Sequence, residues 1–358
     1  MSYKYTHFIP QSIAPKGAKR IVVYDANGKE FCHIALGGLT PIAKTKLYSF
    51  GVVSDLHLWG TEPSWMANTK FDNALTYFEN KGCALCAHCG DITQTGFYKR
   101  TVESEAGTEY LDESQFAKYK EICDKHSLPV YGICGNHESY YGMSITDNLP
   151  LLEKYTGRSE LHYSIPQGND LFIFIGQPLG NKPMSDDALN WLATTLEDNR
   201  DKRCFIFVHP HISSGNPLGA YSSNPIFDWW EQNTGQTSAF KDLLNHHKNT
   251  IIFHGHSHTK FECQEVDDAA NYTEKDGFKS VHVPSLSRPR NVVNGVLGDY
   301  DNVGSYGYLV DVYADCVVLN GIDFITNKPV PLGTFKIDTT LQTIEANTFT
   351  DSTGTITV

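Results

Sequence analysis

The chain has 358 residues, of which 40% are hydrophobic and 20% charged, a composition typical of a folded protein with a sizeable core. This length exceeds that of an average domain, so we expect either one large domain with extensions or two domains. The formal net charge of -12 would repel nucleic-acid phosphates at long range, which argues against a broad nucleic-acid-binding surface.

Nine cysteines are scattered through the chain without the spacing of a disulfide framework. An odd number of scattered cysteines favours free thiols in a reducing compartment. No segment has the roughly 20 consecutive apolar residues of a membrane span, and the N-terminus lacks an apolar stretch of signal-peptide length. We therefore expect a cytoplasmic protein with no membrane attachment, and the oligomeric state stays open.

Residues 1–45 have the pattern of a small β-rich extension. Segments 20–24 and 30–36 are predicted strands, and the sequence Asp-Ala-Asn-Gly at 25–28 predicts a turn between them. Gly37, Gly38 and Pro41 then interrupt the pattern before the next element begins.

From residue 48 onward, short apolar runs alternate with amphipathic stretches. The runs are rich in β-branched or aromatic residues and are bounded by Gly, Pro, Asn or Asp, which is typical of strands buried on both faces. The predicted strands are 48–53, 84–89, 130–134, 171–176, 204–208, 251–254 and 280–283.

Apolar residues at helical spacing predict four helices between these strands. Their apolar faces carry Phe71, Ala74, Leu75 and Phe78; Phe116, Tyr119, Ile122 and Cys123; Leu189, Leu192 and Leu196; and Phe240, Leu243 and Leu244. Ser185, followed by Asp186 and Asp187, predicts the N-cap of the third helix. The alternation of strands and helices predicts an α/β fold.

The sequence changes character after Arg290. Segments 306–312 and 316–324 are predicted to form a hairpin, and the Thr-rich segment 334–358 alternates as further β structure. These late strands either complete a second sheet or form a separate appendage. We predict a core over residues 46–325, between a β-rich N-terminal extension at 1–45 and a β-rich C-terminal tail at 326–358.

Five short polar clusters follow predicted strands, where α/β proteins usually place ligand-binding residues. In chain order they are Asp55-Leu56-His57, Gly90-Asp91, Gly135-Asn136-His137-Glu138, His209 and Gly255-His256-Ser257-His258. If the chain stays extended after residue 53, the side chains of Asp55 and His57 point the same way. Gly255 frees the backbone, so that His256 and His258 fall on one side.

The clusters supply carboxylates, imidazoles and one neutral amide, but no thiolate. Such ligands suit Zn, Mn, Fe or Ni rather than a structural cysteine–zinc site. One tetrahedral ion needs fewer ligands than these clusters offer. Two ions about 3.5–4 Å apart, bridged by one carboxylate, would use them all.

The ordered series D-x-H, G-D, G-N-H-E, H and G-H-x-H resembles the calcineurin-like metallophosphoesterases over roughly residues 48–290. The resemblance implies two facing β-sheets flanked by helices and two divalent or mixed-valence metal ions, either Mn, Fe or Zn. The implied ligands are Asp55, His57 and His258 for the first ion and Asn136, His209 and His256 for the second, with Asp91 bridging both. His137 would be the catalytic residue, close to a phosphoryl oxygen or the leaving group.

Two details distinguish branches of this family. Gln94 stands three positions after Asp91, where purple acid phosphatases carry a tyrosine, and the Asp-Arg-Gly signature of serine/threonine protein phosphatases does not follow Gly90-Asp91. The pattern is closest to the broad branch that includes class III cyclic-nucleotide phosphodiesterases. It implies a phosphodiesterase or phosphomonoesterase for a small phosphoester substrate, with in-line attack on phosphorus by a hydroxide bound to two metals.

Two alternatives remain. A nuclease of the same fold is disfavoured by the acidic charge and by the lack of a basic stretch studded with aromatic residues. A binding or structural component of a larger assembly would use the terminal β extensions for docking, with the metal core subsidiary.

Several residues near the clusters have other interpretations. His88 is interpreted as a core residue, His254 as a packed or supporting histidine, and Glu138 as a structural carboxylate. Arg288 and Arg290 either reach a substrate phosphate or are surface charges.

Overall fold

The computed structural model describes residues 45–339 except 98, 102–108, 143–144, 178–185, 211–233, 266–270, 275–276 and 294–295, together with strands near both termini. These outlying strands form two antiparallel hairpins, β1 (Arg20–Tyr24) with β2 (Glu30–Ala35) and β19 (Thr348–Asp351) with β20 (Gly354–Thr357). The two strands predicted in the N-terminal extension are thus confirmed. The predicted turn at 25–28 lies outside the described residues.

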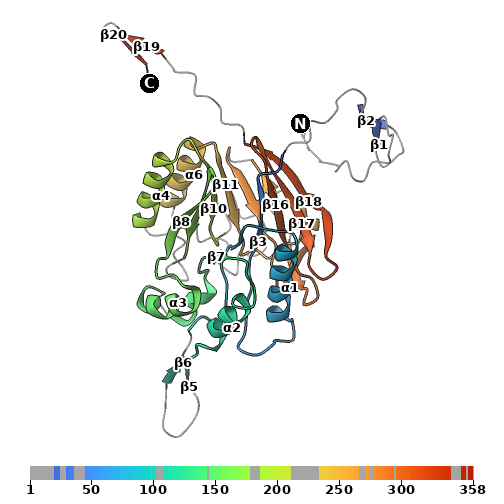
Figure 1. Ribbon diagram of the computed structural model, residues 1–358, viewed down its shortest axis with the longest axis vertical. Coiled ribbons are helices and arrows are strands. Elements are labelled where there is room, and N and C mark those ends of the chain that lie inside the picture. The colour runs from blue at the N-terminus through green and yellow to red at the C-terminus, as the bar shows by residue number, and fades with distance from the viewer. Residues whose placement is uncertain are drawn as a thin grey trace.

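Two six-stranded sheets form the body of the protein (Figure 1). The first has the order β12 (Tyr272–Thr273), β13 (Lys279–His282), β11 (Thr250–His254), β10 (Arg203–Phe207), β9 (Asp170–Ile175) and β8 (His162–Gln167). The second has the order β18 (Lys328–Asp338), β17 (Cys316–Asp323), β16 (Tyr306–Val312), β3 (Tyr48–Val53), β4 (Cys86–His88) and β7 (Val130–Gly132). All seven strands predicted between residues 48 and 283 are present, with slightly shifted ends.

Each sheet contains a set of neighbouring parallel strands. Strands β9, β10, β11 and β13 run parallel to one another in the first sheet, and β3, β4 and β7 do so in the second. The carboxyl ends of parallel strands lie at the same edge of a sheet. The loops that follow these strands are therefore brought together.

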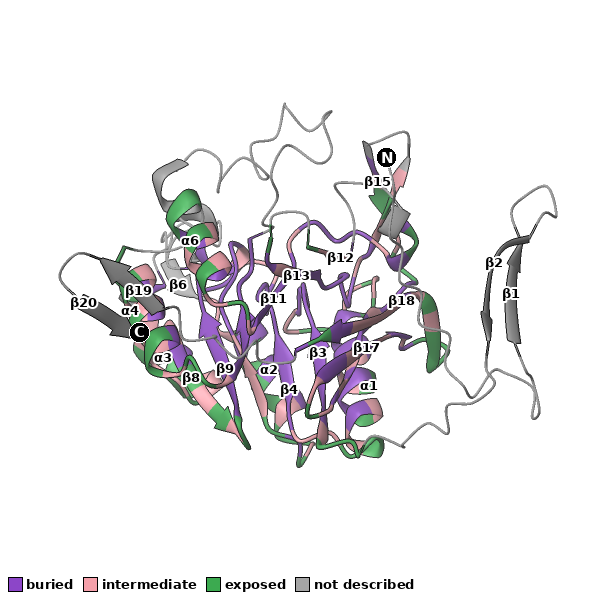
Figure 2. Cartoon of the chain, turned by 90° about the horizontal axis from the view of Figure 1, so that it is seen from above, coloured by how far each residue is buried: buried purple, intermediate pink, exposed green. Residues whose placement is uncertain are grey.

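The space between the two sheets holds the main hydrophobic core. Phe172 and Phe174 alternate along β9 with residues of the opposite face, and they pack in this core with Phe50 of β3 and Phe205 of β10. The rings of Phe50 and Phe172 lie 4.8 Å apart in an edge-on arrangement. Figure 2 shows these central strands as the most buried part of the chain. Period-two alternation thus gives the central strands β9, β10 and β11 one face for the partner sheet and one for the helices.

Helices cover the outer faces of both sheets (Figure 1). On the first sheet lie α4 (Asp186–Asp198) and α6 (Thr234–His246), which bury Leu192, Leu196 and Phe240 against β9 and β10. On the second lie α1 (Ala67–Asn80), α2 (Ser114–Cys123) and α3 (Leu149–Thr156). The predicted α/β class, with two facing sheets flanked by helices, is confirmed.

The four predicted helices are present, whereas α3 was not predicted. It has only eight residues with a proline in its first turn, and Leu152 is its one fully buried side chain, so its apolar periodicity is weak. The predicted cap Ser185 lies outside the described residues. No helix in the described part of the chain is both long and apolar enough to cross a lipid bilayer.

The late strands complete the second sheet, one of the two arrangements the sequence leaves open. β16 and β17 form the predicted hairpin, and β18 pairs with β17, for example Phe335 with Leu319. Residues 328–338 therefore belong to the sheet of the core, whereas the predicted boundary at 325/326 assigns them to the tail. Ile337 of β18 is buried in the main core, and this burial stabilises β18 as a strand of the second sheet. The division of the chain into domains otherwise stays a prediction.

Candidate metal centre

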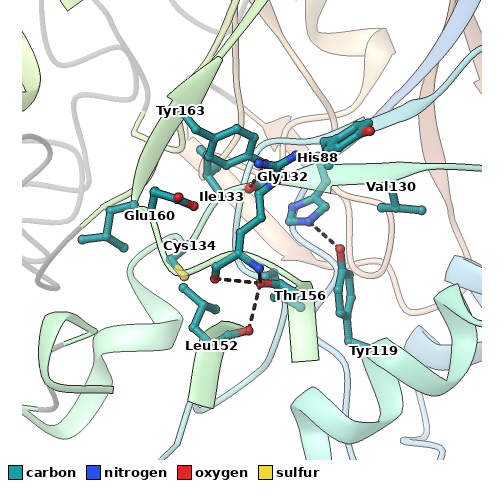
Figure 3. Close-up of a pocket in the computed structure, with 14 residues that line it drawn as sticks. His88, Tyr119, Val130, Gly132, Ile133, Cys134, Leu152, Thr156, Glu160 and Tyr163 are labelled. Carbon is teal, nitrogen blue, oxygen red and sulfur yellow. Dashed lines mark hydrogen bonds between the residues drawn. The ribbon is translucent and has the colours of Figure 1, made fainter. Parts of the chain in front are cut away.

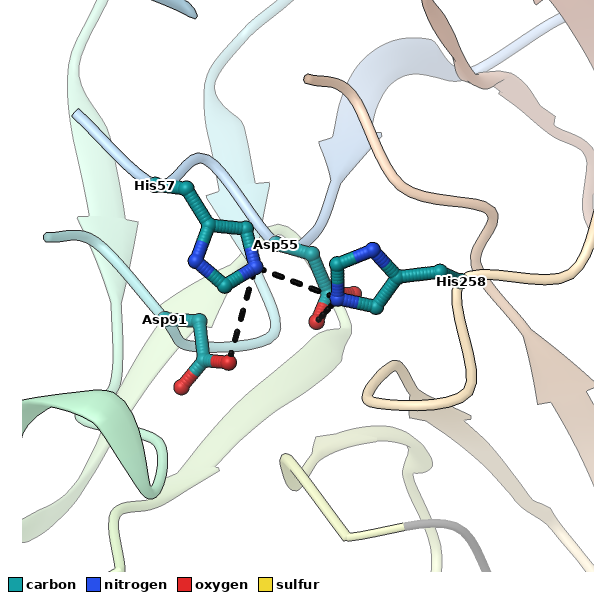
Figure 4. A group of neighbouring side chains, drawn as sticks. All are labelled: Asp55, His57, Asp91 and His258. Carbon is teal, nitrogen blue, oxygen red and sulfur yellow. Dashed lines mark hydrogen bonds and ion pairs between the residues drawn. The ribbon is translucent and has the colours of Figure 1, made fainter. Parts of the chain in front are cut away.

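The predicted ligands come together beyond the carboxyl ends of the parallel strands. Asp55, His57, Asp91 and His258 each offer one ligand atom, and these atoms all lie within 4.8 Å of one another (Figure 4). Asp91, His209 and His256 form a second group that meets the same limit. Loops from both sheets therefore meet in one place, and Asp91 belongs to both groups.

The carboxylate of Asp91 lies between the imidazoles. Its Oδ2 atom is 3.8 Å from His57 Nε2, 3.3 Å from His209 Nε2 and 3.7 Å from His137 Nε2. Its Oδ1 atom accepts a hydrogen bond of 3.0 Å from the backbone N–H of His137. A single carboxylate shared by two groups is the arrangement expected of a bridging ligand.

Hydrogen bonds to backbone carbonyls orient two of the imidazoles. His209 Nδ1 donates to the carbonyl of Cys89 at 2.7 Å, and His258 Nδ1 donates to the carbonyl of Arg288 at 2.8 Å. In the neutral ring this tautomer leaves the lone pair of Nε2 directed at the cluster. Such an outer hydrogen bond is typical of a histidine that binds a metal.

The spacing of the ring nitrogens fits a cation. His57 Nε2 and His258 Nε2 lie 3.1 Å apart (Figure 4), and His209 Nε2 and His256 Nδ1 are also 3.1 Å apart. Asp55 Oδ1 lies 3.2 Å from His258 Nε2. Basic nitrogens and carboxylate oxygens that converge this closely in a buried place need a shared positive charge. The residues present therefore fit divalent metal ions.

Asn136 adds a neutral oxygen to the second group. Its Oδ1 atom lies 2.9 Å from His209 Nε2, and the residue is 1% exposed. A neutral ligand keeps the net charge of a two-cation site positive, which an anionic substrate requires. The structure thus brings all seven predicted ligands together.

The local charges keep the two aspartates ionised. Burial by itself raises the pKa of Asp91, but the positive charges of His209 and His137 outweigh it and hold that pKa well below its usual range. Burial lowers the pKa of His209, but the adjacent Asp91 carboxylate raises it to about 9. Without a bound cation His209 would hold a proton at neutral pH, so cation binding there displaces a proton.

The loops that carry these side chains have an unusual backbone. Asp55, His57, Asp91, His256 and His258 have positive φ angles of 53°, 48°, 51°, 73° and 61°. The chain therefore does not stay extended after β3. The expectation that an extended chain points Asp55 and His57 the same way does not apply. Left-handed residues other than glycine cost on the order of 1–3 kcal/mol each and cluster at functional sites.

Two glycines permit the close approach of these loops. A Cβ atom at Gly135 would lie 2.3 Å from Asp91 Oδ1, and one at Gly255 would lie 1.9 Å from Ser54 Oγ and 2.6 Å from Asp55 Oδ2. Any larger residue at either position would push an aspartate out of place. This explains why glycine precedes the polar residues in both clusters.

The predicted catalytic residue, His137, lies beside both groups. Its Nδ1 atom donates to the carbonyl of Gln94 at 2.6 Å, which directs Nε2 towards Asp91. Its ring lies 4.4 Å from the ring of His57. The side chain is 13% exposed, whereas that of His57 is fully buried, so His137 is the more accessible to a substrate.

Glu138 supports the loops, as the sequence predicts. It is fully buried and accepts hydrogen bonds from the N–H of Gly135 at 2.7 Å and of Thr93 at 2.8 Å. Burial, with a contribution from the charge of Asp91, raises its pKa to about 7. Its partners are these two backbone amides and the hydroxyl of Thr93 at 3.0 Å, and they link the segments that carry Asp91 and Asn136.

A buried network that sequence reasoning missed supports the last cluster. Ser257, between the two histidines of this cluster, lies with its Oγ atom 2.7 Å from His282 Nε2, and His282 Nδ1 lies 3.2 Å from Asn271 Oδ1. Ser285 and Ser287 both donate to the carbonyl of Asp55, at 3.2 Å and 3.0 Å. These residues are distant in sequence, so no spacing pattern could reveal them.

A separate pocket contains none of the predicted site residues (Figure 3). His88 lines it, 1% exposed, with its Nε2 atom 3.2 Å from the hydroxyl of Tyr119. A Cβ atom at Gly132 would lie 1.9 Å from the same nitrogen, so the ring is packed tightly against β7. The prediction that His88 is a core residue is confirmed.

We expect His88 to make folding sensitive to acid. Burial, with a smaller contribution from His209, lowers its pKa from 6.5 to about 3, so between these pH values the unfolded chain binds a proton that the folded protein excludes. The free energy of unfolding therefore keeps its full value well above pH 6.5. It falls as the pH drops below 6.5, by about 2 kcal/mol at pH 5. Urea unfolding of metal-free protein at pH 7.5 and pH 5 should show this loss, and His88→Phe should lose about 2 kcal/mol less over the same interval. An equal loss in both proteins would contradict the assignment.

Known proteins resemble the chain in sequence and in fold. A family model described as calcineurin-like phosphoesterase matches residues 48–260. The structure is similar to a dimetal phosphatase from Danio rerio, with a TM-score of 0.53 at 15% identity, covering 82% of this chain and 99% of that one. It is also similar to a purple acid phosphatase from yellow lupin (Lupinus luteus) seeds, with a TM-score of 0.50 at 13% identity, covering 89% of this chain and 59% of that one. At such identities the likeness to solved structures shows a shared fold. No curated protein matches the sequence closely enough to be called a relative.

Proposed function

The chain belongs to the calcineurin-like phosphoesterase family, and on this premise we propose that it hydrolyses small phosphoric esters at a centre of two divalent metal ions. Membership of this family makes the protein a phosphoester hydrolase; the centre and its substrate are the proposal. The observation that carries the proposal is the place of Asp91, whose carboxylate belongs to two groups of candidate ligands at once.

The proposed ligands divide into two sets around Asp91. Asp55, His57 and His258 hold the first ion, and Asn136, His209 and His256 hold the second. The set has imidazole, carboxylate and amide donors without thiolate, which suits Mn, Fe or Zn. When bound, two such cations make water nucleophilic at neutral pH and neutralise the charge of a phosphoryl group.

His137 is the proposed proton carrier. Its Nδ1–H is fixed on the carbonyl of Gln94, so that only Nε2 can exchange a proton on the side of Asp91. A proton on Nε2 makes the ring cationic, and its transfer to the leaving oxygen restores the neutral ring. Charge that develops on that oxygen is stabilised in the same step.

The proposed substrate is a small ester rather than a nucleic acid, because the net charge of -12 opposes a polyanion. We also propose a cytoplasmic location. It is supported by the eight described cysteines, all of which are free thiols.

The proposal is tested by metal analysis together with an ester panel. Purified protein is loaded separately with Mn, Fe or Zn, its metal content is measured, and hydrolysis of p-nitrophenyl phosphate and bis(p-nitrophenyl) phosphate is followed. We expect about two ions per chain and hydrolysis that a chelator abolishes. Protein that binds none of the three metals and hydrolyses neither ester would refute the proposal.

A further inference from the structure

The backbone of Arg288 is tied to the candidate metal centre. Arg288 lies in the segment after β13, and its carbonyl accepts the hydrogen bond of His258 Nδ1 at 2.8 Å. Its N–H donates to Ser285 Oγ at 3.0 Å, and that hydroxyl donates to the carbonyl of Asp55 at 3.2 Å. The start of this side chain is therefore fixed next to two candidate ligands.

Two aromatic rings and one amide hold the guanidinium group. Its Cζ atom lies 4.5 Å from the ring centroid of Trp65 and 4.6 Å from that of Tyr300, at the end of β15 (Val296–Tyr300). The Nη2 atom donates to Gln94 Oε1 at 2.8 Å. Such contacts attract the cation to the ring faces and restrict its motion.

The guanidinium of Arg288 is connected to His258 and His137, two residues that we expect near a bound substrate. The ring of Tyr300 is 5.5 Å from the ring of His258, and the carbonyl of Gln94, whose side chain Arg288 contacts, accepts the hydrogen bond of His137 Nδ1. The guanidinium is thus linked to His258 through the ring of Tyr300 and to His137 through Gln94. Because its plane is fixed, it can present a fork of N–H donors in one direction.

The chemistry of phosphoric esters determines what such a cation would recognise. A phosphomonoester dianion has three non-bridging oxygens that carry charge, whereas a diester has two and places an ester oxygen in the third position. Two metal ions accommodate the charge of two oxygens. A further fixed cation beside them favours the substrate whose third oxygen is anionic.

We propose that Arg288, held between Trp65 and Tyr300, binds the third non-bridging oxygen of a phosphomonoester dianion and makes the site selective for monoesters over diesters. This inference rests on the proposed function, because it concerns the substrate of the same centre. It adds the class of ester, which the family alone leaves open.

Arg290 provides a matched control two residues further on. Its Cζ atom also lies 4.6 Å from the ring of Tyr300, but its Nε atom donates to the carbonyl of Gly298 at 2.7 Å. Its guanidinium is therefore bonded within the hairpin of β14 (Arg290–Val293) and β15. Replacing Arg290 removes an equal charge at almost the same place in the sequence.

The test compares Arg288→Met with Arg290→Met and the native protein, each loaded with Mn. Calorimetry measures binding of inorganic phosphate and of dimethyl phosphate, and kinetics give kcat/KM for p-nitrophenyl phosphate and bis(p-nitrophenyl) phosphate. For Arg288→Met we expect a loss of about 10- to 100-fold in phosphate affinity and in kcat/KM for the monoester, because a charge-assisted hydrogen bond is lost. The diester values should stay within about 3-fold, the metal content should be unchanged, and Arg290→Met should match the native protein.

Equal losses for monoester and diester, or unchanged phosphate affinity, would overturn the inference. If Arg288→Met loses metal or fails to fold, Arg288→Lys carries the same comparison, since it keeps the charge but lacks the planar fork; its monoester-to-diester ratio should fall by roughly 3- to 10-fold, and an unchanged ratio would overturn the inference. Failure of the proposed function itself would appear differently, as a native protein that hydrolyses neither ester.

Discussion

Asp91→Asn protein should bind about one metal ion per chain or fewer and should lose about a thousandfold or more in kcat. The reason is the position of the carboxylate, which lies within reach of both groups of imidazoles and belongs to both sets of candidate ligands. An amide of the same shape keeps one oxygen but removes the negative charge that two cations would share. Metal analysis and steady-state kinetics on the same preparation measure both effects.

Asp311→Asn is the control for this substitution. Asp311 lies on β16 and pairs with Lys46 at 3.0 Å, outside both groups, so its replacement should leave metal content and kcat unchanged. Asp91→Asn protein that still binds two ions and keeps its native kcat would show that the carboxylate does not bridge them.

His137→Gln should retain both metal ions and lose about 100- to 10,000-fold in kcat, the usual contribution of a positioned proton donor. The loss should depend on the leaving group. An alkoxide leaving group needs a proton, whereas p-nitrophenolate leaves readily without one, so the loss should be much larger for an alkyl phosphate than for p-nitrophenyl phosphate. Comparing kcat for the two substrates in the native and variant proteins separates proton transfer from binding.

His246→Gln serves as the matched control, because His246 is exposed at the end of α6. It should leave the rates for both esters unchanged. If His137→Gln lowers both rates by the same factor, His137 positions the substrate but does not protonate the leaving group. If it also loses metal, its role lies in supporting the ligands.

Much of the fold could be predicted from the sequence because the strands are strongly marked. Runs such as the one containing Phe172 and Phe174 are apolar, β-branched or aromatic, and end at glycine or proline. Helix α3 escaped prediction because one buried leucine gives no periodicity. The place of β18 was also not decided, since a half-buried alternating strand looks the same in a core sheet and in an appendage.

The candidate ligands could be predicted because each follows a strand and each has a metal-binding side chain. Their backbone could not, since nothing in Asp55 or His57 signals a left-handed conformation. The supporting residues His282 and Asn271 are also invisible in sequence, because they act through contacts between distant segments. The sequence marks Arg288 as a candidate for contact with a substrate phosphate, but only the rings around it distinguish it from a surface charge.

The most direct test is anomalous X-ray diffraction from crystals of the Mn-loaded protein. We predict two anomalous peaks about 3.5–4 Å apart, on either side of the Asp91 carboxylate, one nearest His57 and His258 and the other nearest His209 and His256. A single peak, or peaks that do not contact Asp91, would contradict the account.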